Sequence, residues 1–285
     1  MSFLSQITRL VKDPPPSHLF ELSEAGIAFS QAGQAGFLPF EPGTLVASPV
    51  EDNVLRPDAV ASMIGKFAPA AGAKKRRPAA VILPDYAARV TVLDFDSFPS
   101  SPEEQLSLIR FRVKKTIPFD IEAAAVSYFV QPASASKRIE VLAVTVAMEV
   151  MARYEALFRG AGFHPGVVTT STIAALNLYR GEGVAIVAKL SGSVVTVAVI
   201  AGNTVKLFRC VTLDEPSETE ILAVLQPTFA YVEDELSTPV SKLILCGFQH
   251  TPSGLRCEVE ALRSRYGTPG AFNAGLLGYM ELVQN

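Results

Sequence analysis

The sequence predicts an α/β protein with mixed β-sheets. Strand-like runs alternate with helical runs along the chain, which is the pattern of an α/β fold. In both halves, some strand-like runs follow one another across short turns, and such neighbours pair antiparallel. The sheets are therefore expected to be mixed and not purely parallel. The length of 285 residues suits one large domain or two modest ones.

Residues 2–11 predict a short amphipathic helix. Its apolar side chains recur on one helical face: Phe3, Leu4, Ile7, Leu10 and Val11. Three prolines at 14–16 end the helix and form a stiff spacer. This helix has two alternative roles: it docks on a partner or a membrane surface, or it packs on its own domain.

The first half of the chain predicts strands and helices in alternation. The predicted strands are 18–23, 26–33, 79–83, 88–95, about 125–131, about 139–147 and 166–171. The predicted helices are 56–67, a segment that starts at Ser101, 148–161 and 172–179. The helix after Ser101 carries a capping-box signature, because Ser101 stands at the N-cap, Pro102 at N1 and Glu104 at N3.

The second half begins near 181 with three apolar runs. These predict strands at 184–190, 194–202 and 204–213, and residues 201–204 have the composition of a hairpin turn. The remaining predictions are a helix at 217–236, a strand at 242–246, and helices at 254–265 and 272–283. Pro227 is expected to kink or split the first of these helices.

Composition excludes several classes of protein. Hydrophobic residues make up 49% and charged residues 19%, with a formal net charge of −3, so intrinsic disorder is excluded and a nucleic-acid binder is disfavoured. The three cysteines form no CxxC pair, which favours a reducing compartment. No apolar stretch has the length of a membrane helix and no signal peptide is recognisable, so we expect a cytoplasmic protein.

Familiar catalytic motifs are absent from the sequence. There is no GxxxxGK[ST] loop, no GxGxxG after a strand and no GxSxG elbow, and we predict no catalytic residue. His18, His164 and His250 are isolated, so surface or structural roles are expected and no metal site is predicted. The basic run 74–77 either contacts nucleic acid or anionic lipid or is simply solvated. Cys246 is either a reactive thiol or a small buried residue.

Two long segments resemble a known family. The run SSPEEQLSLIRFRVKKTIPFDIEAAAVSYFV is a capped helix that ends in IPF and leads into a strand. The run VLAVTVAMEVMARYEALFRGAGFHPGVVTTST is a strand, a helix that ends in AG and a further strand. Their order and spacing resemble the PilM family of type IV pilus assembly proteins and, more distantly, the cytoplasmic domain of the type II secretion protein GspL. The resemblance covers most of 18–285 and is most specific at 79–178.

The resemblance implies an actin-like (ribonuclease H-like) fold. Such a fold has two lobes of mixed sheets, an ATP cleft between them and an extra α/β subdomain in the first lobe. The implied divisions are an N-terminal helix and spacer at 1–17, a first lobe at 18–178 with the extra subdomain at about 79–165, a shortened second lobe at 179–266, and a C-terminal helix at 267–285 that returns to the first lobe.

The nucleotide site that the resemblance implies departs from the family pattern. In FELSEAGIAFS, Glu21 keeps the acid of the first hairpin but Ser23 replaces its glycine. In AIVAKLSGS, Lys189 stands at the position of the metal-side aspartate and Ser191 at that of the second glycine.

Two further elements of the site also differ. The third turn keeps Gly247, and the insertion that carries the adenine contact is missing between the last antiparallel strand and the long helix. Lys189 could still neutralise a phosphate, and Ser23, Ser191 and Ser193 could bond one. We expect a degenerate site with no cofactor, and keep ATP with Mg²⁺ as the alternative.

The resemblance also implies a partner. PilM proteins bind the cytoplasmic N-terminal peptide of the membrane protein PilN in a groove between the first lobe and the extra subdomain. The candidate groove residues are Phe111, Val113, Ile117, Pro118 and Phe119, with burial in the core as the alternative for each. Other inner-membrane pilus assembly proteins are expected partners and nucleic acid is not. We expect peripheral association with the inner membrane, either indirect or through residues 2–11.

Three functions are compatible with these observations. The first is a non-catalytic adaptor in pilus or related secretion assembly. The second is a working ATPase or nucleotide-gated switch with an altered site. The third is a structural protein that dimerises or polymerises through the helix at 2–11.

Overall fold

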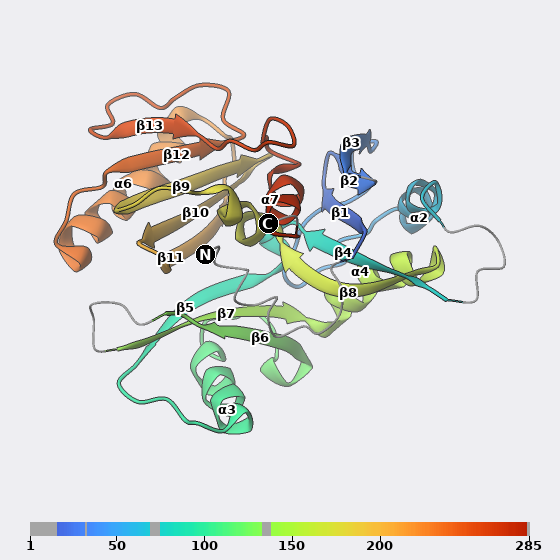
Figure 1. The fold of residues 1–285 in the computed structure, drawn as a ribbon, viewed down its shortest axis with the longest axis horizontal. Helices are drawn as coiled ribbons and strands as arrows, with labels where there is room; N and C mark the ends of the chain where they lie inside the picture. The colour runs from blue at the N-terminus through green and yellow to red at the C-terminus, as the bar shows by residue number, and fades with distance from the viewer. Residues whose placement is uncertain (1–15, 32, 69–74, 133–137, 284–285) are drawn as a thin grey trace.

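Three β-sheets organise the part of the chain that the structure describes (Figure 1). The computed structural model describes residues 16–31, 33–68, 75–132 and 138–283. Two five-stranded sheets form the cores of two lobes, and a three-stranded sheet lies beside them. The predicted helix at 2–11 lies outside the described residues.

The first sheet has the strand order β3-β2-β1-β4-β8. Its strands are β1 (His18–Ser23), β2 (Gly26–Gln31), β3 (Gln34–Pro39), β4 (Arg77–Leu83) and β8 (Phe163–Thr170). The three strands β1, β2 and β3 form an antiparallel meander, whereas β1, β4 and β8 run parallel. The mixed sheet that the sequence predicts is therefore present in the first lobe.

Helices cover both faces of this sheet, and all six residues of β1 are buried as a result. On one face, Phe20 and Leu22 pack with α2 (Pro57–Gly65) and α4 (Met148–Gly160). On the other face, Leu19 packs with α5 (Ser171–Ala175) and α7 (Ala274–Val283). Even His18 is buried, with its ring 5.3 Å from that of Phe163.

An inserted unit of the first lobe contains the three-stranded sheet β5-β7-β6. It comprises β5 (Arg89–Phe95), α3 (Pro102–Val113), the short 3₁₀ helix η2 (Ile121–Ala123), β6 (Ala124–Val130) and β7 (Ile139–Ala147). Ile109 and Val113 of α3 are buried against the sheet. The insertion is shorter than the 79–165 expected for an extra subdomain, because β4 and β8 pair within the first sheet.

The second lobe has the strand order β11-β10-β9-β12-β13. Its strands are β9 (Val184–Ser191), β10 (Val194–Ala201), β11 (Thr204–Thr212), β12 (Lys242–Cys246) and β13 (Glu258–Ala261). The predicted antiparallel run from β9 to β11 is confirmed, and β12 pairs parallel with β9. The long helix α6 (Glu218–Leu236) packs its apolar residues on this sheet.

Some local predictions were wrong. The helix predicted at 254–265 is replaced by strand β13, whose four residues pair in register with β12. Strand β3 was missed in a glycine-rich segment, where the ring of Phe29 covers Gly36. Helix α6 continues through Pro227, which excludes the split but not the kink that the sequence offered as alternatives. The side chain of Ser101 makes no capping hydrogen bond, although Pro102 does begin α3.

The inserted sheet is also fastened to the second lobe. The Gln131 amide bonds both backbone groups of Val205: Nε2 donates to the carbonyl oxygen over 2.8 Å, and Oε1 accepts from the N–H over 2.7 Å. Beside this contact, Lys206 Nζ lies 2.5 Å from Glu140 Oε2, and both side chains are 10% exposed. Buried polar groups without partners are costly. The two contacts therefore favour one fixed position of the inserted sheet against the second lobe.

Candidate interlobe site

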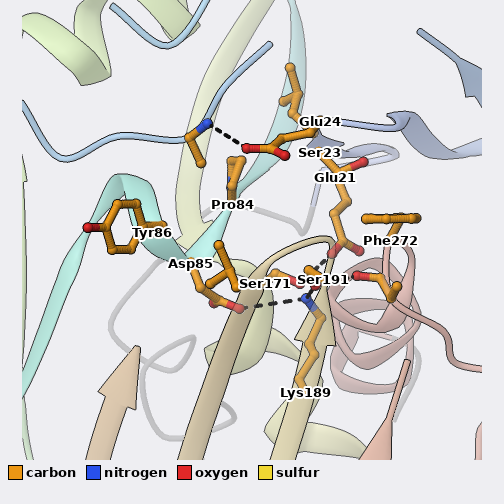
Figure 2. Close-up of a pocket in the computed structure, with 14 residues that line it drawn as sticks. Glu21, Ser23, Glu24, Pro84, Asp85, Tyr86, Ser171, Lys189, Ser191 and Phe272 are labelled. Carbon is orange, nitrogen blue, oxygen red and sulfur yellow. Dashed lines mark hydrogen bonds and ion pairs between the residues drawn. The ribbon is translucent and has the colours of Figure 1, made fainter. Parts of the chain in front are cut away.

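A narrow cleft separates β1 of the first lobe from β9 of the second (Figure 2). Its volume is about 30 Å³, which is room for a few water molecules at most. Small-molecule sites in proteins usually enclose about 300–1,000 Å³. The cleft is narrow because polar side chains from both lobes meet inside it.

Lys189 is the central residue of the cleft. It extends from β9 and is only 3% exposed, and its Nζ lies 3.6 Å from Asp85 Oδ2 of the first lobe (Figure 2). The same ammonium group donates to Ser191 Oγ. A buried ammonium group is tolerated only when it is paired and hydrogen-bonded. This ion pair therefore joins the two lobes across the cleft.

Asp85 was missed in the sequence, and it anchors the pair. It begins the 3₁₀ helix η1 (Asp85–Ala87), directly after β4. Its Oδ1 accepts from the backbone N–H of Thr172 over 2.7 Å, and its Oδ2 accepts from Thr172 Oγ1 over 2.6 Å and from Thr196 Oγ1 over 3.2 Å. A carboxylate at the carboxyl end of a buried strand, where α/β proteins commonly bind ligands, was the available signal.

Glu21 occupies the cleft from the first hairpin, as predicted from the resemblance. Its Oε1 accepts from Ser171 Oγ, and its Oε2 accepts from the N–H of Leu276 in the first turn of α7 over 2.7 Å. Burial raises the pKa of Glu21, while Lys189 and these two hydrogen bonds oppose that rise. Both carboxylate oxygens are therefore already engaged by the protein itself.

The predicted serines also have partners within the chain. Ser23 Oγ donates to the carbonyl of Gly26 and accepts from its N–H, which closes the turn between β1 and β2. Ser191 Oγ donates to the carbonyl of Ala271 over 2.7 Å. Ser193 lies in the turn between β9 and β10 and does not line the cleft.

Gly247 lines a second cavity, of about 420 Å³. This cavity lies between the turn after β9, the start of α6 and the segment from Gly247 to Pro252, and it shares Ala271 and Phe272 with the cleft. Gly247 has φ +79°, and an added Cβ would lie 2.2 Å from the Leu190 carbonyl oxygen. The glycine is thus required for the close approach of two backbone segments.

The space left in the cleft, about 30 Å³, is smaller than a nucleotide. Lys189 occupies part of the cleft, and the polar atoms of Glu21 and Ser23 are hydrogen-bonded within the chain. Among the described residues, no three His, Cys, Asp or Glu side chains are grouped so that they could hold a metal ion. His164 and His250 are exposed, far in sequence from the buried His18.

The five predicted partner-binding residues differ in their exposure. Phe111 is 70% exposed on α3, and Pro118 is exposed in the loop that follows. Val113 is fully buried, because α3 turns that side chain into the core of the insertion, which is the alternative that the sequence left open for each of the five. Ile117 and Phe119 are partly buried against the same core.

The thiols of the second lobe lead to a prediction about reactivity. Burial raises the pKa of Cys210 to about 12, that of Cys246 to about 11 and, to a smaller extent, that of Cys257. Cys246 is buried, and Cys210 and Cys257 are partly exposed, so the pKa separates the last two. Since the thiolate is the nucleophile, native protein titrated with an aromatic disulfide reagent at pH 8 should show one fast thiol, that of Cys257. The other two should react only on unfolding. The Cys257→Ser variant is the control and should lose the fast phase; a persisting fast phase would contradict the assignment.

The sequence left Cys246 as either a reactive thiol or a small buried residue. The structure shows that it is buried, with 3% of it exposed. Its Sγ donates to the carbonyl of Gly270, on the segment that leads to α7.

In the described part of the chain, no helix is long and apolar enough to span a membrane.

Solved structures with the same architecture are known. A PilM–PilN type IV pilus biogenesis complex aligns with a TM-score of 0.65 at 16% identity, over 95% of this chain and 97% of that one. The cytoplasmic domain of EpsL, an inner-membrane component of the type II secretion system of Vibrio cholerae, aligns with a TM-score of 0.54 at 17% identity, over 94% and 92% of the two chains.

A third structure, from Bacteroides thetaiotaomicron and described as an actin-like ATPase fold of unknown function, has a TM-score of 0.53 at 12% identity, over 92% and 94% of the chains. No protein-family model and no curated protein sequence matches the chain. The predicted actin-like, two-lobed α/β fold is therefore confirmed, and the resemblance to PilM and to the GspL cytoplasmic domain is confirmed at the level of the fold.

Proposed function

We propose that this chain is a non-catalytic, actin-like adaptor in the inner-membrane assembly of a type IV pilus or a related secretion machine. The observation that carries the proposal is the buried Lys189, which fills the interlobe cleft and pairs with Asp85. The similarity of the fold to a PilM–PilN complex and to the EpsL cytoplasmic domain supports the choice of pathway.

The cleft chemistry argues against ATP turnover. Phosphoryl transfer depends on metal charge and on positioned groups around the transferred phosphate. Among the described residues that line the cleft, Lys189 is the one basic side chain, and it pairs with the chain's own Asp85, while Glu21 is hydrogen-bonded to Ser171 and α7. A contact between the lobes made by the chain's own side chains supports an adaptor that needs no nucleotide cycle.

The partner in this proposal is the cytoplasmic N-terminal tail of a PilN-like membrane protein, with other pilus assembly proteins as further contacts. Capture of an extended peptide by strand addition and apolar pockets uses backbone groups and does not require any polar group of the cleft. The adaptor would act in the cytoplasm, peripherally attached to the inner membrane through that tail.

Calorimetric titration of the full chain with Mg·ATP and Mg·ADP tests the non-catalytic assignment. We expect no binding up to millimolar nucleotide and no phosphate release above the buffer rate. Micromolar binding with hydrolysis would overturn the proposal and establish the alternative, an ATPase or nucleotide-gated switch. The Asp85→Asn variant is the matched control, since it frees Lys189 and shows whether the ion pair is what excludes phosphate.

A second titration tests the partner. A synthetic N-terminal tail of a PilN-like membrane protein carries a fluorophore, and its anisotropy is followed on addition of protein. We expect saturable binding in the micromolar range and none with a scrambled tail. Absence of binding at tens of micromolar protein would overturn this part of the proposal.

A further inference from the structure

The C-terminal end of α3 carries an exposed aromatic ring surrounded by positive charge. Phe111 has the largest exposed fraction, 70%, of the exposed large hydrophobic residues in the described part of the chain. Four basic residues lie within one helical turn of it along the sequence: Arg110, Arg112, Lys114 and Lys115. We call these five residues the α3 basic patch.

The local charge runs against that of the whole chain. The chain has a formal net charge of −3, whereas residues 105–119 contain these four basic residues and no acidic one. Glu103 and Glu104 lie at the other end of α3, and Asp120 and Glu122 follow the loop after it. In the described ranges, no ion pair joins any of the four to a carboxylate. Lys114 and Lys115 are exposed, so their charges face solvent.

The two arginines hold the patch in place. Arg110 donates to the carbonyls of Ile121 and Ala124, over 2.8 and 3.3 Å, and the guanidinium of Arg112 lies 5.2 Å from the centre of the Phe95 ring. Ile109 and Val113 are buried on the opposite side of the helix. These contacts fix the orientation of α3, and this orientation places the Phe111 side chain in solvent.

The patch lies at one end of the described part of the molecule. Helix α3 covers the outer side of the three-stranded sheet, at the lower margin of Figure 1, away from both five-stranded sheets. No other labelled element lies beyond it in that view. A flat partner could reach this end of the molecule without contacting either lobe.

We propose that the α3 basic patch docks on an anionic phospholipid surface, with the Phe111 ring entering the headgroup region and the lysines facing the lipid phosphates. The inference rests on the proposed function, which puts the chain at the inner membrane. It adds which surface of the protein contacts the lipid. Aromatic and basic side chains are the usual combination at membrane surfaces, and the attraction of each Lys or Arg to anionic lipid adds to the others.

A protein partner fits the patch less well than a lipid surface. Lysine is depleted at the centre of protein interfaces, and hot-spot side chains there are enclosed by a well-packed surround. Here two lysines follow a single exposed ring at the end of a helix. Electrostatic attraction between these lysines and lipid headgroups needs no pocket of matching shape. The lipid contact alone is weak, but it gains from the effective concentration that a bound membrane-protein tail provides.

The absence of tryptophan from the chain allows a direct test. Phe111→Trp places a single indole in the patch of the full-length protein, at an exposed position that tolerates it. Vesicles of phosphatidylglycerol and phosphatidylcholine should shift its emission to the blue, vesicles of phosphatidylcholine alone should not, and about 0.5 M salt should reverse the shift. An unchanged emission maximum with the anionic vesicles would overturn the proposal.

Vesicle flotation of a paired variant measures the charge effect. Each basic side chain near an anionic surface contributes about fivefold in partitioning, so Lys114→Gln with Lys115→Gln should lower the partition coefficient about 30-fold. The matched control is Lys75→Gln with Arg76→Gln, an equal loss of charge at another exposed basic run. Equal losses in both variants would overturn the assignment to α3.

Titration with the PilN-like tail separates this inference from the proposed function. The Lys114→Gln/Lys115→Gln variant should bind the tail as the wild type does while it loses vesicle binding. If the wild type binds the tail but no vesicles, lipid docking is overturned and the proposed function stands. If the wild type binds no vesicles and the variant also loses tail binding, the patch contacts protein, and lipid docking is again overturned.

Discussion

Replacing Lys189 by methionine is expected to lower the free energy of unfolding by about 3–5 kcal/mol. Methionine fills much of the same space, so the loss arises mainly from charge. Without the ammonium group, the Asp85 side chain, which is 3% exposed, keeps its hydrogen bonds from Thr172 and Thr196 but has no counter-charge, and it lies next to the buried Glu21. Urea denaturation followed by circular dichroism measures the effect, with the midpoint and slope fitted together.

The double variant Lys189→Met with Asp85→Asn is the control for that result. Removal of both charges of the pair leaves Glu21, which keeps its hydrogen bonds from Ser171 and Leu276, and asparagine can still accept from the N–H of Thr172. Most of the lost stability should return, as it does when a buried ion pair is replaced as a unit. A cost below about 1 kcal/mol for Lys189→Met alone would show that the lysine is not buried in an ion pair in solution.

Gly278→Ala is expected to lower the free energy of unfolding by about 3 kcal/mol. Gly278 lies in α7 where this helix crosses α5, and an added Cβ would lie 2.1 Å from the carbonyl oxygen of Ala174 and 2.8 Å from the Cα of Ala175. Backbone atoms cannot rotate away as a side chain would, so the two helices must separate. Thermal unfolding by calorimetry measures the loss.

Gly65→Ala is the matched control for the helix crossing. Gly65 ends α2, and no atom lies within 4 Å of a Cβ added there. This variant should gain up to about 1 kcal/mol from the better helix propensity of alanine. If Gly278→Ala behaved in the same way, α5 and α7 would not pack as closely as the structure shows.

Much of the fold could be predicted from the sequence because its signals are local. The antiparallel run β9-β10-β11 has continuous apolar strands separated by short turns. The three strands and the turn between the last two were predicted from the sequence. The segment 254–265 was misassigned because four alternating residues carry little periodicity, and only pairing with β12 decides that they form a strand. Strand β3 depends on its neighbour β2 in the same way.

The site was harder to predict because distant segments build it. Glu21 and Lys189 were placed in one cleft by resemblance, but nothing local indicates that Asp85 would pair with a lysine more than 100 residues away. Thr172 and Thr196, which bond that carboxylate, come from two further segments. Val113 was placed in a groove because an apolar residue on a helix looks the same in sequence whether it faces a partner or its own core.

Helix α7 has a consequence for how the protein is made. Residues 274–282, at the very end of the described chain, are buried in the core that holds β1, β4 and α5, and the N–H of Leu276 bonds Glu21 from the first strand. In chain order, α7 follows every strand of both lobes and the long helix α6. The lobe that is translated first therefore stays open on one face until α7 has been made, while the second lobe already has its strands and its long helix. The first lobe would be completed after the second, and a chain that lacks its last turns would expose that face.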